Sequence, residues 1–466
     1  MIAVLCALLS GGLFHLSQGL SDAWYLAWLA PAPVLFLGYG AAPRWQLVLA
    51  SLVAYAMGQI YLVQCYAPIF PPPVLALFLL TLAPLLLLFP LAILFARFAY
   101  RHLPPLASLF AFPACWTAME FLVGLVSPHG SYGALAYSQM SAPIVIQSAS
   151  LFGMYAVSFL ICLFANAVAM ALQRRKGSLA AASLGVAICA ANVAFGAARL
   201  QAPPGETIRV AALSDVLVMA SAFKADTLDS AVGVSSTYAA AVRAAAAGGA
   251  RIVATPEGGV LSKRPWDARV LAPLAAAARQ THVQIVAGVD ERAPQGDIAI
   301  RFAPDGATQR YDKRHLMPLI ESQYTPGTAT GLLGNGLAMT ICKDMDFPRT
   351  IRGDAQSGIR LMIVPSSDLV HDGWTHGRLA LMRGVENGFA VLRAANQGLL
   401  TASDAQGRIL ARKTARPRDG MSSLVADLPL GPGPTLYTRI GDIFAWLCLV
   451  FALAALAFAW RRAAKP

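Results

Sequence analysis

Long apolar runs follow one another through the first 200 residues and limit what this chain can fold into. Each run is about 17–28 residues long, enough for a helix to cross the hydrocarbon core of a bilayer. The composition agrees, because 57% of the 466 residues are hydrophobic and only 13% are charged. We predict about eight membrane spans, at 2–17, 23–39, 46–65, 71–96, 104–126, 144–172, 178–198 and 441–460. The first run has no basic segment before it and a second follows directly, so we expect it to be retained as a span.

The basic residues predict how these spans are oriented. Lys and Arg gather in the cytoplasmic loops of membrane proteins. With the N-terminus inside, the outer loops near 18–22, 66–70 and 127–143 contain no Lys or Arg. The inner loops and the C-terminal tail contain Arg44, Arg97, Arg101, Arg174, Arg175, Lys176, Arg461, Arg462 and Lys465. This alternation places residues 199–440 outside the cytoplasm, on the periplasmic side of a bacterial inner membrane.

The net charge of +12 does not indicate a nucleic-acid-binding protein. Much of this charge lies in the loops where the orientation of the spans requires it. The charges of the polar middle are mixed and form no long basic stripe. We therefore expect no nucleic-acid partner.

The polar middle of the chain has the pattern of an α/β domain. Short β-like runs are predicted at 208–213, 251–254, 283–289, 298–302, 337–342, 361–364, 390–394 and 399–403. Helical stretches lie between them at 225–247, 266–280, 347–356 and 375–388. Strands that alternate with helices form sheets covered by those helices. In such folds the chemistry gathers just beyond the strand ends.

Cys342 is the only cysteine of this polar stretch, which is roughly 240 residues long, so it has no disulfide partner there. The other six lie in or at the ends of the spans, where a thiol usually acts as a small apolar group. Cys342 instead ends the apolar run 337–342 and is followed by Lys343 and Asp344. A thiol at a strand end beside charged groups is a candidate nucleophile. The alternative is a structural thiol.

Two further segments favour the nucleophile. Glu257 follows the strand at 251–254 and precedes two glycines, which let backbone approach a ligand. Lys313 lies in the polar segment 311–318, and Glu321 follows it. Taken singly, Glu257 is compatible with a helix cap and Lys313 with a solvated surface charge. The order Glu, Lys, Cys at strand ends within one α/β domain is more specific.

This order resembles that of the nitrilase (carbon–nitrogen hydrolase) superfamily, whose catalytic triad is Glu, Lys and Cys. With about eight spans around the domain, the chain resembles the apolipoprotein N-acyltransferase family over nearly its whole length. Further matching positions are Ser127, Pro128, Gly130, Tyr137, Gln139, Gln147, Gly153, Tyr155, Asn166, Asn396, Asp404, Gly407, Tyr437, Arg439, Gly441 and Asp442. The resemblance implies an α-β-β-α sandwich carried by a multi-pass α-helical membrane domain.

The resemblance also implies the organisation of the chain. We expect a seven-span membrane domain at 1–200 and a catalytic nitrilase-like domain at 201–435. A last membrane helix with a basic cytoplasmic tail should occupy 436–466.

By resemblance, Cys342 is the nucleophile, Glu257 the general base and Lys313 the cation that stabilises the oxyanion. A neighbouring base or cation raises the thiolate fraction of a cysteine. A donor held near the attacked carbonyl contributes roughly 2.7–4 kcal/mol. Glu321 corresponds to a second active-site glutamate. The substrate-binding or supporting set also includes Lys343, Asp344, Tyr137 and Glu120, and no metal or cofactor is expected.

The implied reaction is a two-step acyl transfer. Cys342 takes an acyl chain from a membrane phospholipid as a thioester and releases the lysophospholipid. The N-terminal amine of a diacylated lipoprotein then accepts the chain. We expect the protein to work as a monomer embedded in the membrane.

Two other functions remain open at this stage. The family usually follows the nucleophile with Tyr-Glu, whereas this chain has Lys343 and Asp344, and this favours a membrane-anchored amidase or ester hydrolase with another acceptor. The third alternative is a scaffold without activity, which the intact Glu257, Lys313 and Cys342 disfavour. His371, Asp372 and His376 suggest a metal only weakly, because their spacing matches no tight site. Glu120, inside a span, is either functional or a helix contact.

Overall fold

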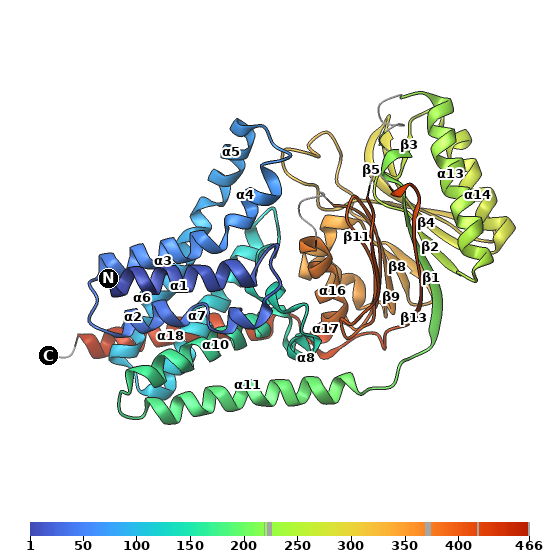
Figure 1. Ribbon diagram of the computed structural model, residues 1–466. Helices are drawn as coiled ribbons and strands as arrows, with labels where there is room; N and C mark the ends of the chain where they lie inside the picture. The colour runs from blue at the N-terminus through green and yellow to red at the C-terminus, as the bar shows by residue number, and fades with distance from the viewer. Residues whose placement is uncertain (219, 221–225, 369–373, 417–418, 465–466) are drawn as a thin grey trace. The chain divides into compact units, whose positions relative to one another are not determined.

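The computed structural model describes residues 1–218, 220, 226–368, 374–416 and 419–464. They form two compact units (Figure 1). The membrane unit comprises Met1–Ser127, Ser131–Gln201 and Ile440–Pro466. The catalytic unit comprises Ala202–Arg439 together with the short loop Pro128–Gly130, which comes from between two apolar helices.

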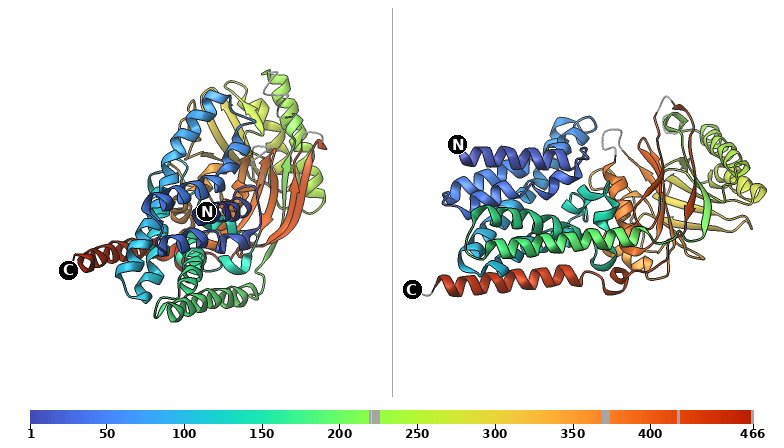
Figure 2. Two further views of the ribbon diagram at one scale, coloured as in Figure 1. Left: turned by 60° about the vertical axis from the view of Figure 1, so that its left-hand side comes forward. Right: turned by 60° about the horizontal axis from the view of Figure 1, so that its bottom comes forward.

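The membrane unit is α-helical throughout its described part. Its longer helices are α1 (Ile2–Ser17), α2 (Ala32–Tyr39), α3 (Arg44–Gly58), α4 (Ile60–Tyr66), α5 (Pro72–Leu82), α6 (Leu88–His102), α7 (Pro105–Val126), α10 (Met154–Gln173), α11 (Ser178–Leu200) and α18 (Ile443–Ala463). Shorter pieces are η1 (Trp24–Trp28), η2 (Ala83–Leu87), η3 (Leu135–Gln139), α8 (Pro143–Ile146) and α9 (Ala149–Phe152), and α17 (Leu436–Ile440) leads into the last helix. Figure 2 shows the blue helices α1 and α3 lying side by side, and α3 also contacts α6.

Six helical stretches among the described residues are long and apolar enough to cross a membrane. They are Arg44–Tyr66, Pro72–His102, Pro105–Val126, Met154–Gln173, Ser178–Leu200 and Ile443–Ala463. The first two predicted spans coincide with shorter apolar helices, Ile2–Ser17 and Trp24–Tyr39. The prediction of a multi-pass helical membrane domain is confirmed.

The predicted start of the sixth span at 144 is wrong. Residues 143–152 form the short helices α8 and α9, and α10 begins only at Met154. The break lies at Gly153, whose φ of 75° is incompatible with a continuing right-handed helix. Apolar composition continues across this break, so hydropathy alone joined two elements.

A buried polar contact joins three of the apolar helices. Asn166 on α10 accepts a hydrogen bond from the hydroxyl of Tyr39 on α2. Its amide donates to the carbonyls of Ser108 and Leu109 on α7, at 3.0 and 2.8 Å. A polar side chain in an apolar interior must find such partners, and each bond stabilises the packing by about 1 kcal/mol.

The catalytic unit contains two sheets within its described residues. The seven-stranded sheet has the order β13-β1-β2-β4-β5-β6, with β3 beside β4. Its strands are β1 (Thr207–Ser214), β2 (Ile252–Ala254), β3 (Val260–Ser262), β4 (Gln284–Arg292), β5 (Gln295–Phe302), β6 (Thr308–Asp312) and β13 (Ser422–Pro429). The six-stranded sheet has the order β12-β11-β10-β9-β8-β7. Its strands are β7 (Leu332–Gly334), β8 (Leu337–Met339), β9 (Leu361–Ser367), β10 (Ala390–Asn396), β11 (Leu399–Ser403) and β12 (Ile409–Thr414).

Alternation along the strands produces a four-layer sandwich. On β1, Val210 and Ala212 face the core between the sheets, whereas Ala211 and Leu213 face the helices α13 (Leu228–Ala247) and α14 (Asp267–Thr281). The second sheet is covered by α15 (Pro348–Ala355) and α16 (Thr375–Asn387). Figure 1 shows α13 and α14 on the outer face of one sheet and α16 on that of the other. The predicted α-β-β-α sandwich is confirmed.

Five strands of the structure were not predicted from the sequence, and one predicted strand is too long. The missed strands are β3, β6, β7, β12 and β13, which are short or lie toward sheet edges with mixed composition. The predicted strand 337–342 ends at Met339. Cys342 instead begins the 3-10 turn η4 (Cys342–Asp346), with a φ of 36°. The nucleophile candidate therefore stands on a turn that follows the strand.

Candidate active site

The ends of different strands bring the predicted acid and base groups together. Glu257 follows β2 and Lys313 follows β6. The Nζ atom of Lys313 lies 2.5 Å from Oε1 of Glu257 and 2.6 Å from Oε1 of Glu321. Lys313 is 2% exposed and Glu257 6%. Three groups separated by up to 64 residues in sequence (257 to 321) thus share one buried contact.

Asp297 is a third carboxylate on Lys313 and was missed by sequence reasoning. Its Oδ2 lies 2.9 Å from Nζ of Lys313, and its carbonyl accepts the backbone N–H of Lys313 at 3.0 Å. Asp297 lies inside β5, whose other residues are mostly buried. A charged residue within such a strand is unusual unless it has a partner, and this could have pointed to Asp297. The carboxylate oxygens of Glu257, Asp297 and Glu321 lie within 4.8 Å of one another. Because the ammonium of Lys313 contacts all three, it supplies the positive charge that this group of acids requires.

The electrostatics of Lys313 follow from this surrounding. Burial disfavours its charged form, but Asp297, Glu257 and Glu321 outweigh burial and raise the pKa of Lys313 well above its usual value. Burial also raises the pKa of Glu257, and the Lys313 charge opposes that rise. Lys313 is therefore a permanent cation, and Glu257 binds a proton more readily than an exposed glutamate does.

Cys342 lies beside this group. Its Sγ is 3.8 Å from the carbonyl oxygen of Ser367, and the preceding carbonyl, of Ser366, accepts the backbone N–H of Glu257 at 3.2 Å. The end of β9 thus contacts both Cys342 and Glu257. Burial and the charge of Glu257 raise the pKa of the Cys342 thiol, whereas Lys313 and Arg393 favour the thiolate. At rest the sulfur is a thiol, and it requires a base to become a nucleophile.

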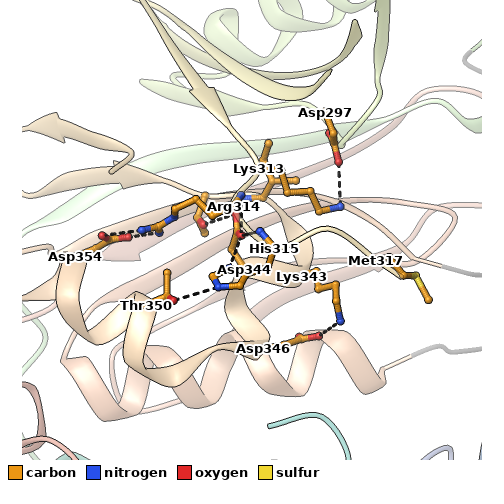
Figure 3. A network of polar contacts seen from close by, with 12 residues as sticks. Asp297, Lys313, Arg314, His315, Met317, Lys343, Asp344, Asp346, Thr350 and Asp354 are labelled. Carbon is orange, nitrogen blue, oxygen red and sulfur yellow. Dashed lines mark hydrogen bonds and ion pairs between the residues drawn. The ribbon is translucent and has the colours of Figure 1, made fainter. Parts of the chain in front are cut away.

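Asp344 connects the nucleophile turn to the segment that carries Lys313. This fully buried carboxylate accepts a hydrogen bond from the Tyr311 hydroxyl at 2.6 Å. It also contacts the backbone N–H and the ring of His315, at 2.8 and 3.0 Å (Figure 3). Burial opposes its ionisation, but the bonds from His315 and Tyr311 hold the pKa of Asp344 below its usual value. Arg314, from the same segment, binds Asp354 of α15. These contacts join the turn that begins at Cys342 to the segment that carries Lys313.

Lys343 points to a different group of residues. Its Nζ lies 3.6 Å from Oδ2 of Asp346 and 3.4 Å from Nδ1 of His129, and Figure 3 shows the side chain extending toward Asp346. Burial and the Lys343 charge lower the pKa of His129 to about 4. His376 lies on the other side of Asp346, with 4.0 Å between Nδ1 and Oδ1. His371 and Asp372, the other members of the weak metal hypothesis, lie outside the described residues.

Tyr137 and Glu120 belong to the membrane unit. Oε1 of Glu120 accepts the backbone N–H of Leu135 at 2.8 Å, and the Tyr137 hydroxyl lies 2.6 Å from Oγ of Ser131. The first contact joins the loop around η3 to α7, and the second lies within this loop. Glu120 and Tyr137 thus have hydrogen-bond partners within the membrane unit itself.

Comparison with known proteins identifies the class of both units. Residues 227–430 match the family described as Carbon-nitrogen hydrolase, and this is the class of the sandwich. Residues 10–167 match the family described as Apolipoprotein N-acyltransferase N-terminal domain. The chain belongs to the apolipoprotein N-acyltransferase family.

Two apolipoprotein N-acyltransferases are similar to this chain over most of its length. The apolipoprotein N-acyltransferase of Geobacter metallireducens is 27% identical, over 98% of this chain and 95% of that protein. The apolipoprotein N-acyltransferase of Shewanella oneidensis is 25% identical, over 72% of this chain and 70% of that protein. Among solved structures, an amidase from Nesterenkonia sp. covers 53% of this chain and 98% of its own, with 23% identity and a TM-score of 0.40.

Proposed function

We propose that this membrane protein transfers an acyl chain from a phospholipid, through a thioester on Cys342, to the N-terminal amine of a diacylated lipoprotein. The observation that carries this proposal is the buried contact between Lys313 and Glu257 beside the Cys342 thiol. A base, a fixed cation and a thiol in one place are the groups that acyl transfer requires. The helical membrane unit anchors the chain in the bilayer, where both substrates are also anchored.

In the first step, Glu257 accepts the thiol proton while Sγ of Cys342 attacks the ester carbonyl of the phospholipid. Negative charge develops on the carbonyl oxygen, and the ammonium of Lys313 stabilises it. The carbon–oxygen bond to the glycerol then breaks, and Glu257 returns the proton to the departing oxygen. The products are a Cys342 thioester and a lysophospholipid.

In the second step, the lipoprotein amine attacks the thioester carbonyl and Glu257 accepts its proton. The carbon–sulfur bond breaks, the amide forms, and the proton returns to the Cys342 sulfur. A raised pKa suits Glu257 to these transfers, because a group that both accepts and returns a proton works best when its pKa lies near the working pH. Asp297 and Glu321 hold Lys313 in place through both steps.

The residue pair after the nucleophile bears on the hydrolase alternative. Asp344 is fully buried in bonds to the Lys313 segment, and Lys343 extends toward Asp346. Both side chains therefore support the nucleophile turn, and their difference from Tyr-Glu gives no reason to prefer water as the acceptor. We propose further that the protein is a monomer whose catalytic unit faces the periplasm, with the parts divided at 1–200, 201–435 and 436–466.

Complementation tests the proposal. A bacterial strain depleted of its own N-acyltransferase should grow when it expresses this protein, and mass spectrometry should find a third acyl chain on its lipoprotein N-termini. Cys342→Ala should abolish both, whereas Cys448→Ala, a free cysteine of α18, should not. Free N-terminal amines in cells that express the wild-type protein would contradict the proposal and direct attention to amide or ester hydrolysis.

A further inference from the structure

A buried ion pair lies behind the nucleophile and takes no part in the two steps above. Asp368 and Arg393 are each about 1% exposed. Nη1 of Arg393 donates to Oδ2 of Asp368 at 2.6 Å, and Nη2 donates to Oδ1 of the same carboxylate. The bidentate geometry fixes the relative orientation of the two side chains. Burying such a pair costs desolvation energy that apolar residues would not cost, so its presence calls for a reason beyond stability.

The position of the pair in the sheet suggests that reason. Asp368 follows directly on β9, whose last carbonyls contact Glu257 and Cys342. Arg393 lies on the neighbouring strand β10. The backbone N–H of Asp368 donates to the carbonyl of Asn396 at 2.9 Å, which attaches this strand end to β10 a second time. Asp368 is thereby held at a strand end that contacts both the base and the thiol.

The surrounding backbone leaves the Asp368 carboxylate little freedom. A Cβ on Gly398 would lie 2.0 Å from Oδ2 of Asp368, closer than any real contact. The chain between β10 and β11 therefore passes directly over the carboxylate. Nη1 of Arg393 also approaches the carbonyl of Leu399, at 3.5 Å. A substitution of Asp368 or Arg393 should therefore shift the backbone at the end of β9.

The pair also contributes charge at the sulfur. The charged groups with the largest effects on the Cys342 thiol include Glu257, Lys313, Arg393 and Asp368. Arg393 favours the thiolate, as Lys313 does, whereas Asp368 opposes it, as Glu257 does. Two of these charges belong to the proposed catalytic groups, and the other two are the members of the ion pair. The two members of the pair therefore act on the thiol in opposite directions.

We propose that Asp368 and Arg393 are positioning residues that hold the end of β9 against the thiol and balance the charge beside it. This inference rests on the proposed role of Cys342 as the nucleophile. It assigns to each member an effect of opposite sign on thiol ionisation. A pair that served only to stabilise the fold would have no such signature, because removing either member would break the same bond.

The experiment is alkylation of Cys342 by iodoacetamide in the full-length protein in detergent micelles. The rate is followed from about pH 6 to about pH 12, because the thiol pKa is raised. Mass spectrometry of the peptide that contains Cys342 separates it from the other thiols. Asp368→Asn should lower the midpoint by about one pH unit, because Arg393 is left uncompensated. Arg393→Gln should raise it by a similar amount. The control Asp404→Asn removes a carboxylate that binds Arg408 at 2.5 Å and should leave the midpoint unchanged.

Shifts of the same sign in both variants, or no shift in either, would overturn the proposal. If Arg393→Gln does not fold, Arg393→Lys replaces it, because lysine keeps the charge but loses the bidentate contact. A midpoint of Arg393→Lys near that of the wild type, together with the lowered midpoint of Asp368→Asn, would support the proposal. Any other result would refute it. Alkylation needs no acyl donor. Opposite shifts in a protein that fails to N-acylate would therefore refute the proposed function and leave the positioning pair standing.

Discussion

The hydroxyl of Tyr311 donates a hydrogen bond of 2.6 Å to the carboxylate of Asp344. This bond joins strand β6, which leads to the cation Lys313, to the turn that begins with Cys342. The cation and the nucleophile come from different sheets, so their separation depends on contacts of this kind. Asp344, the second residue after the nucleophile candidate, therefore links the turn to the strand that leads to Lys313.

Removal of the Asp344 carboxylate should therefore reduce both stability and activity. Asp344→Ala leaves the buried N–H and hydroxyl groups of its partners unsatisfied, at a cost of about 1–3 kcal/mol. Denaturant unfolding in detergent measures the loss. Gly353→Ala on α15, where an added Cβ meets open space, is a control that should change little. Full acylation by Asp344→Ala would contradict its positioning role.

Asp344 should also make the protein acid-sensitive. Its pKa is lowered in the folded state, so its contribution is present above the unfolded pKa of about 3.9 and is lost as pH falls through the folded pKa. The wild type should lose more unfolding free energy than Asp344→Asn between about pH 5 and about pH 3. Parallel pH curves for the two proteins would count against this assignment.

Lys313→Met should be among the most damaging substitutions in the catalytic unit. It leaves Glu257, Asp297 and Glu321 buried together without a cation, which costs about 3–5 kcal/mol. The loss should be smaller at acid pH, where the carboxylates accept protons. Thermal unfolding at two pH values measures both effects. Lys413→Met, at an exposed lysine of β12, should unfold as the wild type does.

The first half-reaction can be isolated by withholding the acceptor. With phospholipid alone, the wild type should accumulate an acyl adduct on the Cys342 peptide and release one lysophospholipid for each adduct. Glu257→Gln removes the base and should slow adduct formation by about 10²–10⁴-fold. Mass spectrometry at timed intervals gives the rate. An adduct on another cysteine, or equal rates in the two proteins, would exclude the proposed roles.

Gly130 should be sensitive to a single added methyl group. Its φ is 55°, and a Cβ there would lie 2.4 Å from the carbonyl oxygen of Asp346, in the nucleophile turn. Gly420 has a similar φ of 61° with open space around it, so Gly420→Ala carries only the backbone cost of about 1–2 kcal/mol. Gly130→Ala should lose distinctly more unfolding free energy and slow adduct formation on Cys342. Equal losses would show that the contact with the turn is unimportant.

Reporter fusions test the orientation of the chain. A reporter after Arg462 should behave as cytoplasmic, and one inserted within 290–297 should behave as external, because basic residues remain on the inner side. Alkaline phosphatase and a fluorescent protein that matures only in the cytoplasm report the two sides. The same localisation for both fusions would refute the topology.

The sequence alone supported the helical membrane domain, the α/β alternation and the strand-end position of Glu257. These features are local, since an apolar run or an alternation of two reports which faces of an element are buried. It did not reveal the break at Gly153, because hydropathy is insensitive to backbone angles. It also gave Asp344 only a general supporting role, whereas its partners show how it acts.

What only the tertiary structure decided is which charges meet. Asp297 reaches Lys313 because β5 and β6 pair, and Asp368 reaches Arg393 because β9 and β10 pair in parallel. Pairing between strands depends on the packing of the whole sandwich, and no local pattern encodes it. The residue types needed for acyl transfer are legible in the chain, whereas the partners that position them follow from the order of strands in the two sheets.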